Sequence, residues 1–144
     1  MALNENIRWK QRFNNFSKAY KLLDSVFKEM KVDELSLLEQ EGVIQRFEYT
    51  YELAWKTLKD YLEYSGNLNN IDITARNVFK EAYSAGIIKE HNVFIDMMLS
   101  RNLLSHTYDF AKFKEVIIKI ENDYLNVLED LYNFFMKKLE EDYL

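Results

Sequence analysis

Residues 36–66, SLLEQEGVIQRFEYTYELAWKTLKDYLEYSG, predict one long helix around which the other helices can pack. Ser36 followed by Glu39 fits a capping box, in which each side chain accepts a hydrogen bond from a backbone N–H that the first turn leaves free. Gly66 fits the left-handed residue that often follows a helix. Gly42, which costs a helix about 1 kcal/mol relative to alanine, indicates a kink or a close helix crossing. The apolar stripe is broad enough to predict burial on two sides, in the core and against a partner: Val43, Ile44, Phe47, Tyr51, Leu53, Ala54, Trp55, Leu58, Tyr61 and Leu62.

The segments on either side of this helix carry the same helical periodicity. Thr74 and Asp109 are placed to cap two further helices, and Gly86 is placed to end one of them. The sequence therefore predicts an all-α fold, a four-helix up-and-down bundle with a short additional helix. We expect the flanking helices at about 6–30, 75–85, 91–105 and from 110 to near residue 144, with connections at 31–34, 67–73 and 87–90.

The composition is that of one folded helical domain spanning residues 1–144. The chain has no proline and three glycines, which favours helices, and no cysteine, which excludes disulfides and thiolate sites. We expect a cytoplasmic protein, because the N-terminus lacks the apolar run of a signal peptide and no stretch is apolar enough to span a membrane.

The charge balance limits the class of partner. A net charge of −5 argues against a surface that coats nucleic acid, so we expect no DNA partner and only local binding of RNA or a nucleotide. Residues 1–31 carry seven Lys or Arg and three Asp or Glu, whereas residues 32–64 carry three and eight. The simplest interpretation of these charges is that they lie on solvated helix faces.

Residues 101–108, RNLLSHTY, gather chemically versatile side chains where a helix should end. Arg101 and His106 lie about 140° apart around an ideal helix, whereas Asn102 and His106 share a face. A joint site of Arg101 and His106 therefore requires the helix to unwind near its end, or a second protomer to supply one half. Tyr108 lies in the expected break, where its hydroxyl can be exposed.

Two interpretations of this segment stay open. An arginine guanidinium matches phosphate, and histidine exchanges a proton near neutral pH, so Arg101 and His106 together could move protons at a ribose 2′-hydroxyl without a metal. The alternative is structural. In that case Arg101 pairs with Asp96 or Asp109, and the His106 imidazole hydrogen-bonds a carbonyl and closes the helix.

Other patterns carry less chemistry. His91 stands alone near a helix start, and two histidines in different contexts make no metal site by spacing. The aromatic run 47–56 has the composition of a base-stacking platform, but at helical spacing such runs more often form core and interface. The sequence has no glycine-rich phosphate loop and no serine-nucleophile elbow, and we expect no cofactor.

Three blocks of the chain are similar to those of the nucleotidyltransferase substrate-binding protein family, which belongs to the HEPN superfamily of helical nucleotide-associated domains. The blocks are 7–13 (IRWKQRF), 44–56 (IQRFEYTYELAWK) and 101–109 (RNLLSHTYD), and the resemblance extends over nearly the whole chain. It implies a four-helix bundle with a short extra helix, a homodimer, and a separate small nucleotidyltransferase as partner.

The resemblance also implies site residues. In the toxin branch of the family, the Arg-x4-His-x-Tyr motif makes a metal-independent ribonuclease at the dimer cleft, and the partner neutralises it by adenylylating the motif tyrosine. By position, Arg101 would bind phosphate, His106 would move the proton and Asn102 would orient the site. Tyr108 would lie at the substrate-binding cleft and carry the modified hydroxyl.

Two positions depart from the family pattern. Ser100 stands where many relatives have Asp, and Ala75 stands where many have Pro. Loss of the acid before Arg101 could weaken the orientation of the guanidinium, although the motif itself is whole. Three functions therefore remain: a ribonuclease toxin, a non-catalytic subunit that presents substrate to the nucleotidyltransferase, and a dimeric scaffold whose motif only closes a helix.

Overall fold

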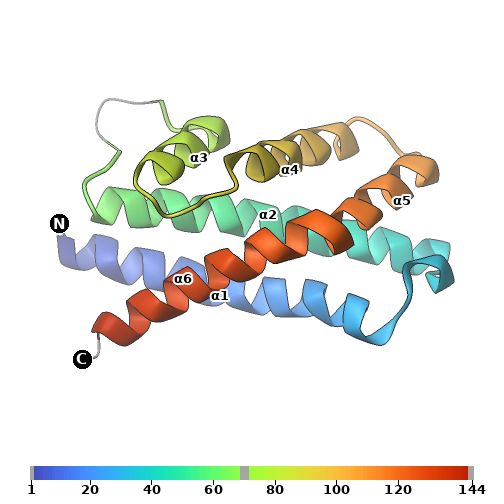
Figure 1. Ribbon diagram of the computed structural model, residues 1–144, viewed down its shortest axis with the longest axis horizontal. Coiled ribbons are helices and arrows are strands. Elements are labelled where there is room, and N and C mark those ends of the chain that lie inside the picture. The colour runs from blue at the N-terminus through green and yellow to red at the C-terminus, as the bar shows by residue number, and fades with distance from the viewer. Residues whose placement is uncertain (1, 69–71, 143–144) are drawn as a thin grey trace.

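The computed structural model describes residues 2–68 and 72–142, which form an all-α bundle. Two long helices run antiparallel along the molecule, two shorter ones lie along one side of them, and the C-terminal helix crosses the bundle (Figure 1). The predicted all-α helical bundle with a short additional helix is confirmed for the described residues. In chain order the elements are α1 (Ala2–Glu29), the 3-10 turn η1 (Val32–Glu34), α2 (Leu37–Tyr64), α3 (Ala75–Ser84), α4 (His91–Leu104), α5 (Phe110–Lys119), the π-helical turn η2 (Ile120–Tyr124) and α6 (Leu125–Asp142).

Helix ends lie where local capping chemistry predicts them. Ser36 Oγ accepts from the Glu39 N–H at 3.1 Å, and the Glu39 carboxylate accepts from the Ser36 N–H at 2.8 Å, which confirms the capping box. Thr74 caps α3 through its hydroxyl, which accepts from a first-turn N–H at 3.2 Å. Gly66 and Gly86 follow their helices with φ of 80° and 76°, a region that costs glycine little because it has no Cβ.

Some details of the helices differ from expectation. α1 begins at Ala2, earlier than the predicted start near residue 6. α2 is helical on both sides of Gly42, and a Cβ there would meet no atom within 4 Å, so the predicted close helix crossing is wrong. The C-terminal helix contains the π turn η2, which its periodicity did not indicate. The predicted loop 67–73 includes residues 69–71, which lie outside the described residues.

The broad apolar face of α2 is buried within the chain. α2 packs against α1, α3, α4 and α5, so it has neighbours on most of its circumference. Phe47, Ala54 and Leu58 retain no exposed surface. The breadth of the stripe is therefore explained by neighbours within the protomer and does not require a partner.

Aromatic side chains of α1, α2 and α6 pack together around Phe135. The ring of Phe135 on α6 lies 5.6 Å from Trp9 and 5.4 Å from Phe13, both on α1, and 5.4 Å from Tyr61 on α2. Such tilted and edge-on pairs add about 0.5–1.5 kcal/mol each beyond the area that they bury. The short α3 packs on the bundle through three fully buried residues: Val78, Phe79 and Ala82.

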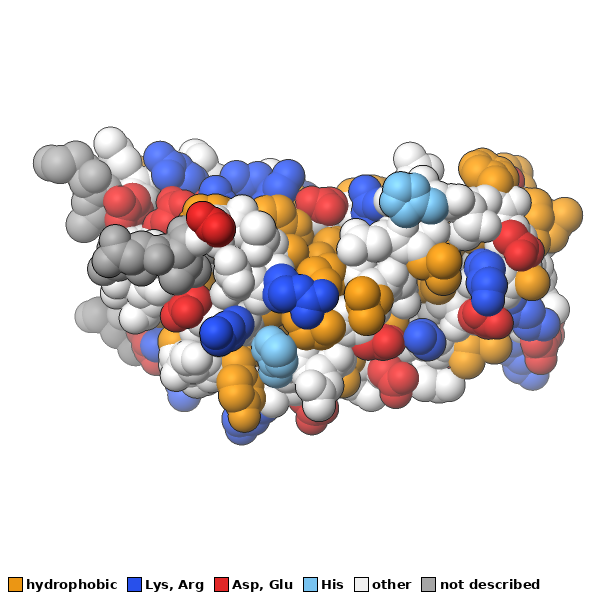
Figure 2. Space-filling view, turned by 90° about the horizontal axis from the view of Figure 1, so that it is seen from above, with side chains coloured by type: hydrophobic (Ala, Val, Ile, Leu, Met, Phe, Trp, Pro, Cys, Tyr) orange, Lys and Arg blue, Asp and Glu red, His pale blue; other side chains and the backbone are white. Residues whose placement is uncertain are grey.

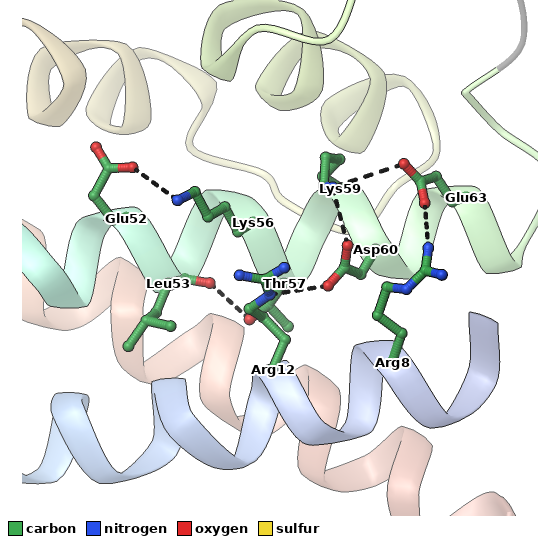
Figure 3. Close-up of polar contacts among 9 residues, drawn as sticks. All are labelled: Arg8, Arg12, Glu52, Leu53, Lys56, Thr57, Lys59, Asp60 and Glu63. Atoms are coloured by element: carbon green, nitrogen blue, oxygen red, sulfur yellow. Dashed lines mark hydrogen bonds and ion pairs between the residues drawn. The ribbon is translucent and has the colours of Figure 1, made fainter. Parts of the chain in front are cut away.

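Two ion pairs join α1 to α2 (Figure 3). Arg12 Nε donates to Asp60 Oδ2 at 3.0 Å, and Lys59 Nζ lies 3.2 Å from Asp60 Oδ1. Arg8 and Glu63 form a further pair at 3.5 Å. Asp60 is only 1% exposed, so its carboxylate depends on these cations. The basic first helix and the acidic second one thus attract each other, whereas the sequence pattern alone indicated only solvated faces.

Buried tyrosines predict a loss of stability at high pH. Burial is the largest cause that raises the pKa of Tyr20, Tyr51, Tyr61 and Tyr124 above the ordinary value of 10.0. In the unfolded chain these hydroxyls ionise near pH 10, whereas in the folded protein they stay protonated to higher pH. Their contribution is therefore complete below about pH 10 and is lost as the pH rises further.

We expect urea midpoints to fall as the pH rises from about 10 to about 11. Lysines also titrate in this range, so the informative comparison is Tyr124→Phe, which removes one of the linked protons and should show a shallower decline. Equal slopes for the wild type and Tyr124→Phe would contradict the assignment to that tyrosine.

Candidate functional site

The helix that carries the motif ends inside it, as predicted. α4 stops at Leu104, and the chain leaves it through a turn in which the Ser105 N–H donates to the Arg101 carbonyl at 3.3 Å. The His106 N–H closes the turn on the Leu103 carbonyl at 3.1 Å. Asp109 then caps α5 with a 2.9 Å hydrogen bond from a first-turn N–H, which confirms the predicted cap. The segment between the end of α4 and the start of α5 is therefore not held within a helix.

Arg101 is directed toward α2. Its Nε lies 3.4 Å from Glu48 Oε2 and 3.9 Å from Glu52 Oε1, and its Nη1 donates to Ser105 Oγ. The predicted pairing of Arg101 with Asp96 or Asp109 is wrong. Glu48 and Glu52 are one helical turn apart on α2, so both reach the same guanidinium across the helix packing. The buried Nε has no hydrogen-bond partner among the described residues, so the guanidinium is incompletely satisfied.

The other motif side chains are exposed. Within the described part of the chain, no group hydrogen-bonds the His106 imidazole; its backbone N–H closes the helix. The structural alternative for His106, an imidazole-to-carbonyl bond, is therefore not seen. Tyr108 is 80% exposed, and its ring makes an edge-to-face contact with the Phe113 ring, with ring centres 5.6 Å apart. Asn102 is exposed on the last turn of α4.

The motif residues line two different surface pockets of one protomer. Arg101 and Asn102 line a pocket of about 320 Å³ between α2, α3 and α4. Tyr108 lines another of about 260 Å³, beside Glu48, and His106 lines neither. Neither of these two pockets of a single protomer thus holds both Arg101 and His106. Their joint site stays a prediction that requires a second protomer.

A buried polar group beneath α4 was not predicted from the sequence. The Tyr124 hydroxyl, on the π turn η2, lies 2.5 Å from Asp96 Oδ2 and 2.7 Å from Ser100 Oγ. Burial raises the pKa of Tyr124, and the hydrogen bond to Asp96 raises it further. Lys119 also pairs with Asp96 at 3.3 Å. These bonds link α4 to the C-terminal helix about one turn before the motif. Because the Asp96 carboxylate is already bonded to Tyr124 and Lys119, it does not pair with Arg101.

The hydrogen bonds among Tyr124, Asp96 and Ser100 also explain why position 100 is a serine and not the aspartate of many relatives. Ser100 is 5% exposed and is directed toward Tyr124. An aspartate there would be buried against the Tyr124 hydroxyl, already bonded to the Asp96 carboxylate. In this chain Arg101 is oriented by Glu48 and Glu52 instead, so the missing acid does not leave the guanidinium without a carboxylate.

The structure also places the two weaker patterns of the sequence, the aromatic run 47–56 and His91. Two of the four aromatic residues in the run, Phe47 and Tyr51, are buried in the core, as expected. The other two are not: Tyr49 is partly exposed, and Trp55 is half-buried and lines the same pocket as Arg101. His91 is half-buried against the Tyr83 ring, with ring centres 5.6 Å apart, which fits a structural role.

Two kinds of feature are absent from residues 2–68 and 72–142. No three His, Asp or Glu side chains in this part of the chain gather as metal ligands would. None of the helices formed by these residues combines the length and the apolar character needed to cross a bilayer.

The fold and the exposed segment define the class: an all-α bundle that presents an Arg-x4-His-x-Tyr motif across the end of a helix. Residues 11–137 match the family described as "Nucleotidyltransferase substrate binding protein like", and the chain belongs to this family.

Two relatives place the chain more closely. It is 34% identical over 84 residues to the "Probable ribonuclease HepT" of Haemophilus influenzae, a match that covers 56% of this chain and 57% of that protein. The chain thus spans little more than half the length of this curated relative. A crystal structure of a Thermus thermophilus protein superposes with a TM-score of 0.72 at 27% identity, over 82% of this chain and 96% of that one.

Proposed function

We propose that this chain, as a single domain, is the substrate-binding subunit of a two-component minimal nucleotidyltransferase system and that its 101–108 segment cleaves RNA without a metal. The observation that carries the proposal is the exposure of His106, whose imidazole makes no hydrogen bond to any described residue. The incompletely satisfied guanidinium of Arg101 supports it. The Haemophilus relative is named a probable ribonuclease, which is consistent with the same chemistry.

The reaction needs one proton carrier and one anion-stabilising group. The 2′-hydroxyl oxygen of a ribose bonds to the adjacent phosphorus, and the bond from phosphorus to the 5′-oxygen of the next nucleotide breaks. His106 takes the proton from the 2′-hydroxyl and returns it to the leaving 5′-oxygen. Arg101 stabilises the negative charge that develops on the phosphoryl oxygens. Asn102, exposed on the last turn of α4, orients the strand.

The direct test is incubation of the purified chain with single-stranded RNA in the presence of EDTA. We expect fragments that end in a 2′,3′-cyclic phosphate and begin with a 5′-hydroxyl, the products that this bond change requires. RNA that stays intact in EDTA, with soluble folded protein, would overturn the ribonuclease part of the proposal.

We further propose that two copies of the chain pair through α4. Leu99 and Leu103 are 51% and 42% exposed at i and i+4, beside Asn102, and make an unpartnered apolar strip. Figure 2 shows the face that includes α3 and α4, on which exposed hydrophobic side chains lie between charged ones. Pairing across this strip would bring the Arg101 of one copy toward the His106 of the other.

Leu103→Glu is expected to weaken this pairing at least about tenfold, because it places a charge in an apolar contact. Sedimentation over a range of protein concentrations measures the effect. Leu22→Glu is the matched control, since Leu22 is 48% exposed on α1. A wild-type chain that sediments as a monomer at every concentration would contradict the homodimer.

The proposed partner is a separate small nucleotidyltransferase that adenylylates Tyr108. At 80% exposure, the Tyr108 hydroxyl is accessible to a second active site. In the reaction the phenolic oxygen bonds to the α-phosphorus of ATP, pyrophosphate leaves, and the phenolic proton passes to a base of the enzyme.

After co-expression with such an enzyme, intact-mass analysis should show one added adenylyl group, and Tyr108→Phe should remove it. Tyr83→Phe is the control, because Tyr83 is 54% exposed outside the motif. An unmodified wild-type chain recovered from a stable complex, or an adenylyl group retained by Tyr108→Phe, would rule out this assignment.

A non-catalytic dimeric adaptor is the second candidate. It is favoured by the contacts of Arg101 with Glu48, Glu52 and Ser105, which also suit a purely structural arginine. In that case Arg101→Ala lowers the melting temperature and leaves binding to the nucleotidyltransferase intact, and RNA is not cleaved. The EDTA assay separates the two candidates.

A further inference from the structure

We propose that the pocket beside Arg101 binds one nucleotide unit, with its base stacked on Trp55 and its phosphate held by Arg76. This inference deepens the proposed function, on which it rests, by assigning a nucleotide subsite to the substrate-binding subunit. The ligand is a nucleoside monophosphate unit, either free or as one residue of a single strand.

The pocket is formed where three helices meet. α2 contributes Glu52 and Trp55, the start of α3 contributes Arg76, and the end of α4 contributes Arg101 and Asn102. Its volume of about 320 Å³ lies at the lower end of the range for small-molecule sites, which suits one nucleotide rather than a longer segment. An aromatic ring, two guanidinium groups and an amide are thus gathered from segments far apart in the chain.

Trp55 has the properties of a stacking surface. It is half-buried, whereas Phe47 and Tyr51 of the same aromatic run are in the core. Its indole N–H donates to Glu52 Oε2 at 3.0 Å, so the orientation of the ring is set by a hydrogen bond. A base can therefore stack on it at little cost in side-chain entropy, and such stacking tolerates any base.

Arg76 supplies the phosphate contact. The sequence contains five arginines. Four have polar partners: Arg8 and Arg12 pair with carboxylates of α2, Arg46 donates to a carbonyl of α1, and Arg101 pairs with Glu48 and Glu52.

Within residues 2–68 and 72–142, Arg76 alone among the arginines makes no hydrogen bond or ion pair, and it is exposed at the edge of the pocket. A free guanidinium binds phosphate through two parallel hydrogen bonds without first losing a carboxylate partner.

The charges around the pocket favour a single phosphate. Glu52 lines the pocket and already neutralises part of the charge of Arg101. A triphosphate would bring several negative charges against this carboxylate, whereas one phosphate can lie on Arg76. We therefore expect a monophosphate to bind more tightly than the corresponding triphosphate.

The test uses a fluorescent base whose emission is quenched by stacking. The probes are 2-aminopurine riboside 5′-monophosphate, the same nucleoside without phosphate, and a short single-stranded RNA with one 2-aminopurine. His106→Ala protein is used throughout so that the RNA probe stays intact. The monophosphate and RNA arms distinguish a free nucleotide from a nucleotide within a strand.

Trp55→Leu is expected to abolish the quench and weaken binding about tenfold or more, the order that loss of one base stack produces. Tyr49→Leu is its control, since Tyr49 is a partly exposed aromatic on the same helix. Arg76→Ala should weaken the monophosphate and leave the nucleoside unaffected. Its control is Lys80→Ala, which removes an exposed cation from the same helix outside the pocket.

Two results would overturn the inference: no saturable binding of either phosphorylated probe, or binding that Trp55→Leu and Arg76→Ala leave unchanged. Arg76 is exposed, so its variant tests the pocket even if Trp55→Leu unfolds the chain. Failure of this subsite is distinguishable from failure of the proposed function, because the probes report binding in a cleavage-deficient protein. RNA cleavage in EDTA by a wild-type chain that binds no probe would remove the subsite and keep the ribonuclease.

Discussion

His106→Ala is expected to lower the rate of RNA cleavage by about 10²- to 10⁴-fold, the range over which a positioned proton carrier contributes. The imidazole is exposed and makes no hydrogen bond to any described residue, so its removal should leave the fold intact. Thermal unfolding should therefore be unchanged while cleavage is lost. This separation of activity from stability distinguishes a catalytic histidine from one that closes a helix.

The second histidine is a natural control. His91 lies at the start of α4 against Tyr83, far along the helix from the motif. His91→Ala should retain cleavage, even if the loss of its ring contact costs some stability. Equal cleavage by the wild type and His106→Ala would show that any ribonuclease activity in the preparation comes from another source.

Phe47→Ala is expected to lower the free energy of unfolding by about 3–5 kcal/mol, as is typical for removal of a buried aromatic ring. Phe47 has no exposed surface, and its ring stacks on Tyr124 with centres 5.6 Å apart and planes at 17°. The substitution therefore leaves a cavity between α2 and η2, directly beneath the helix that carries the motif. Urea denaturation at one fixed protein concentration measures the change without interference from dimerisation.

Tyr49→Ala is the matched control for this prediction. Tyr49 lies two residues further along α2 and is 37% exposed. Both substitutions introduce the same alanine into the same helix, so the gain in helix propensity is similar and the difference isolates burial. We expect Tyr49→Ala to change stability by roughly 0.5 kcal/mol or less. A similar loss for the two variants would mean that the two faces of α2 are not buried as the structure indicates.

Local chemistry allowed the helix boundaries to be predicted well. Ser36, Thr74 and Asp109 cap their helices through hydrogen bonds that span two or three residues, so neighbouring sequence suffices. Gly66 and Gly86 act over the same range through their own backbone. The break after α4 follows from these signals. The π turn η2 was missed, because apolar spacing alone does not distinguish one wider turn from regular helix.

The candidate site was predicted in its residue types but not in its contacts. The amino-acid sequence by itself determined the all-α class, most helix ends, and the position of His106 and Tyr108 in a break between helices. The tertiary structure decided that Arg101 meets Glu48 and Glu52, and that Trp55 lines a pocket while Phe47 enters the core. Capping acts within one helical turn, whereas these contacts depend on how each helix is rotated and crossed against its neighbours, which periodicity leaves free.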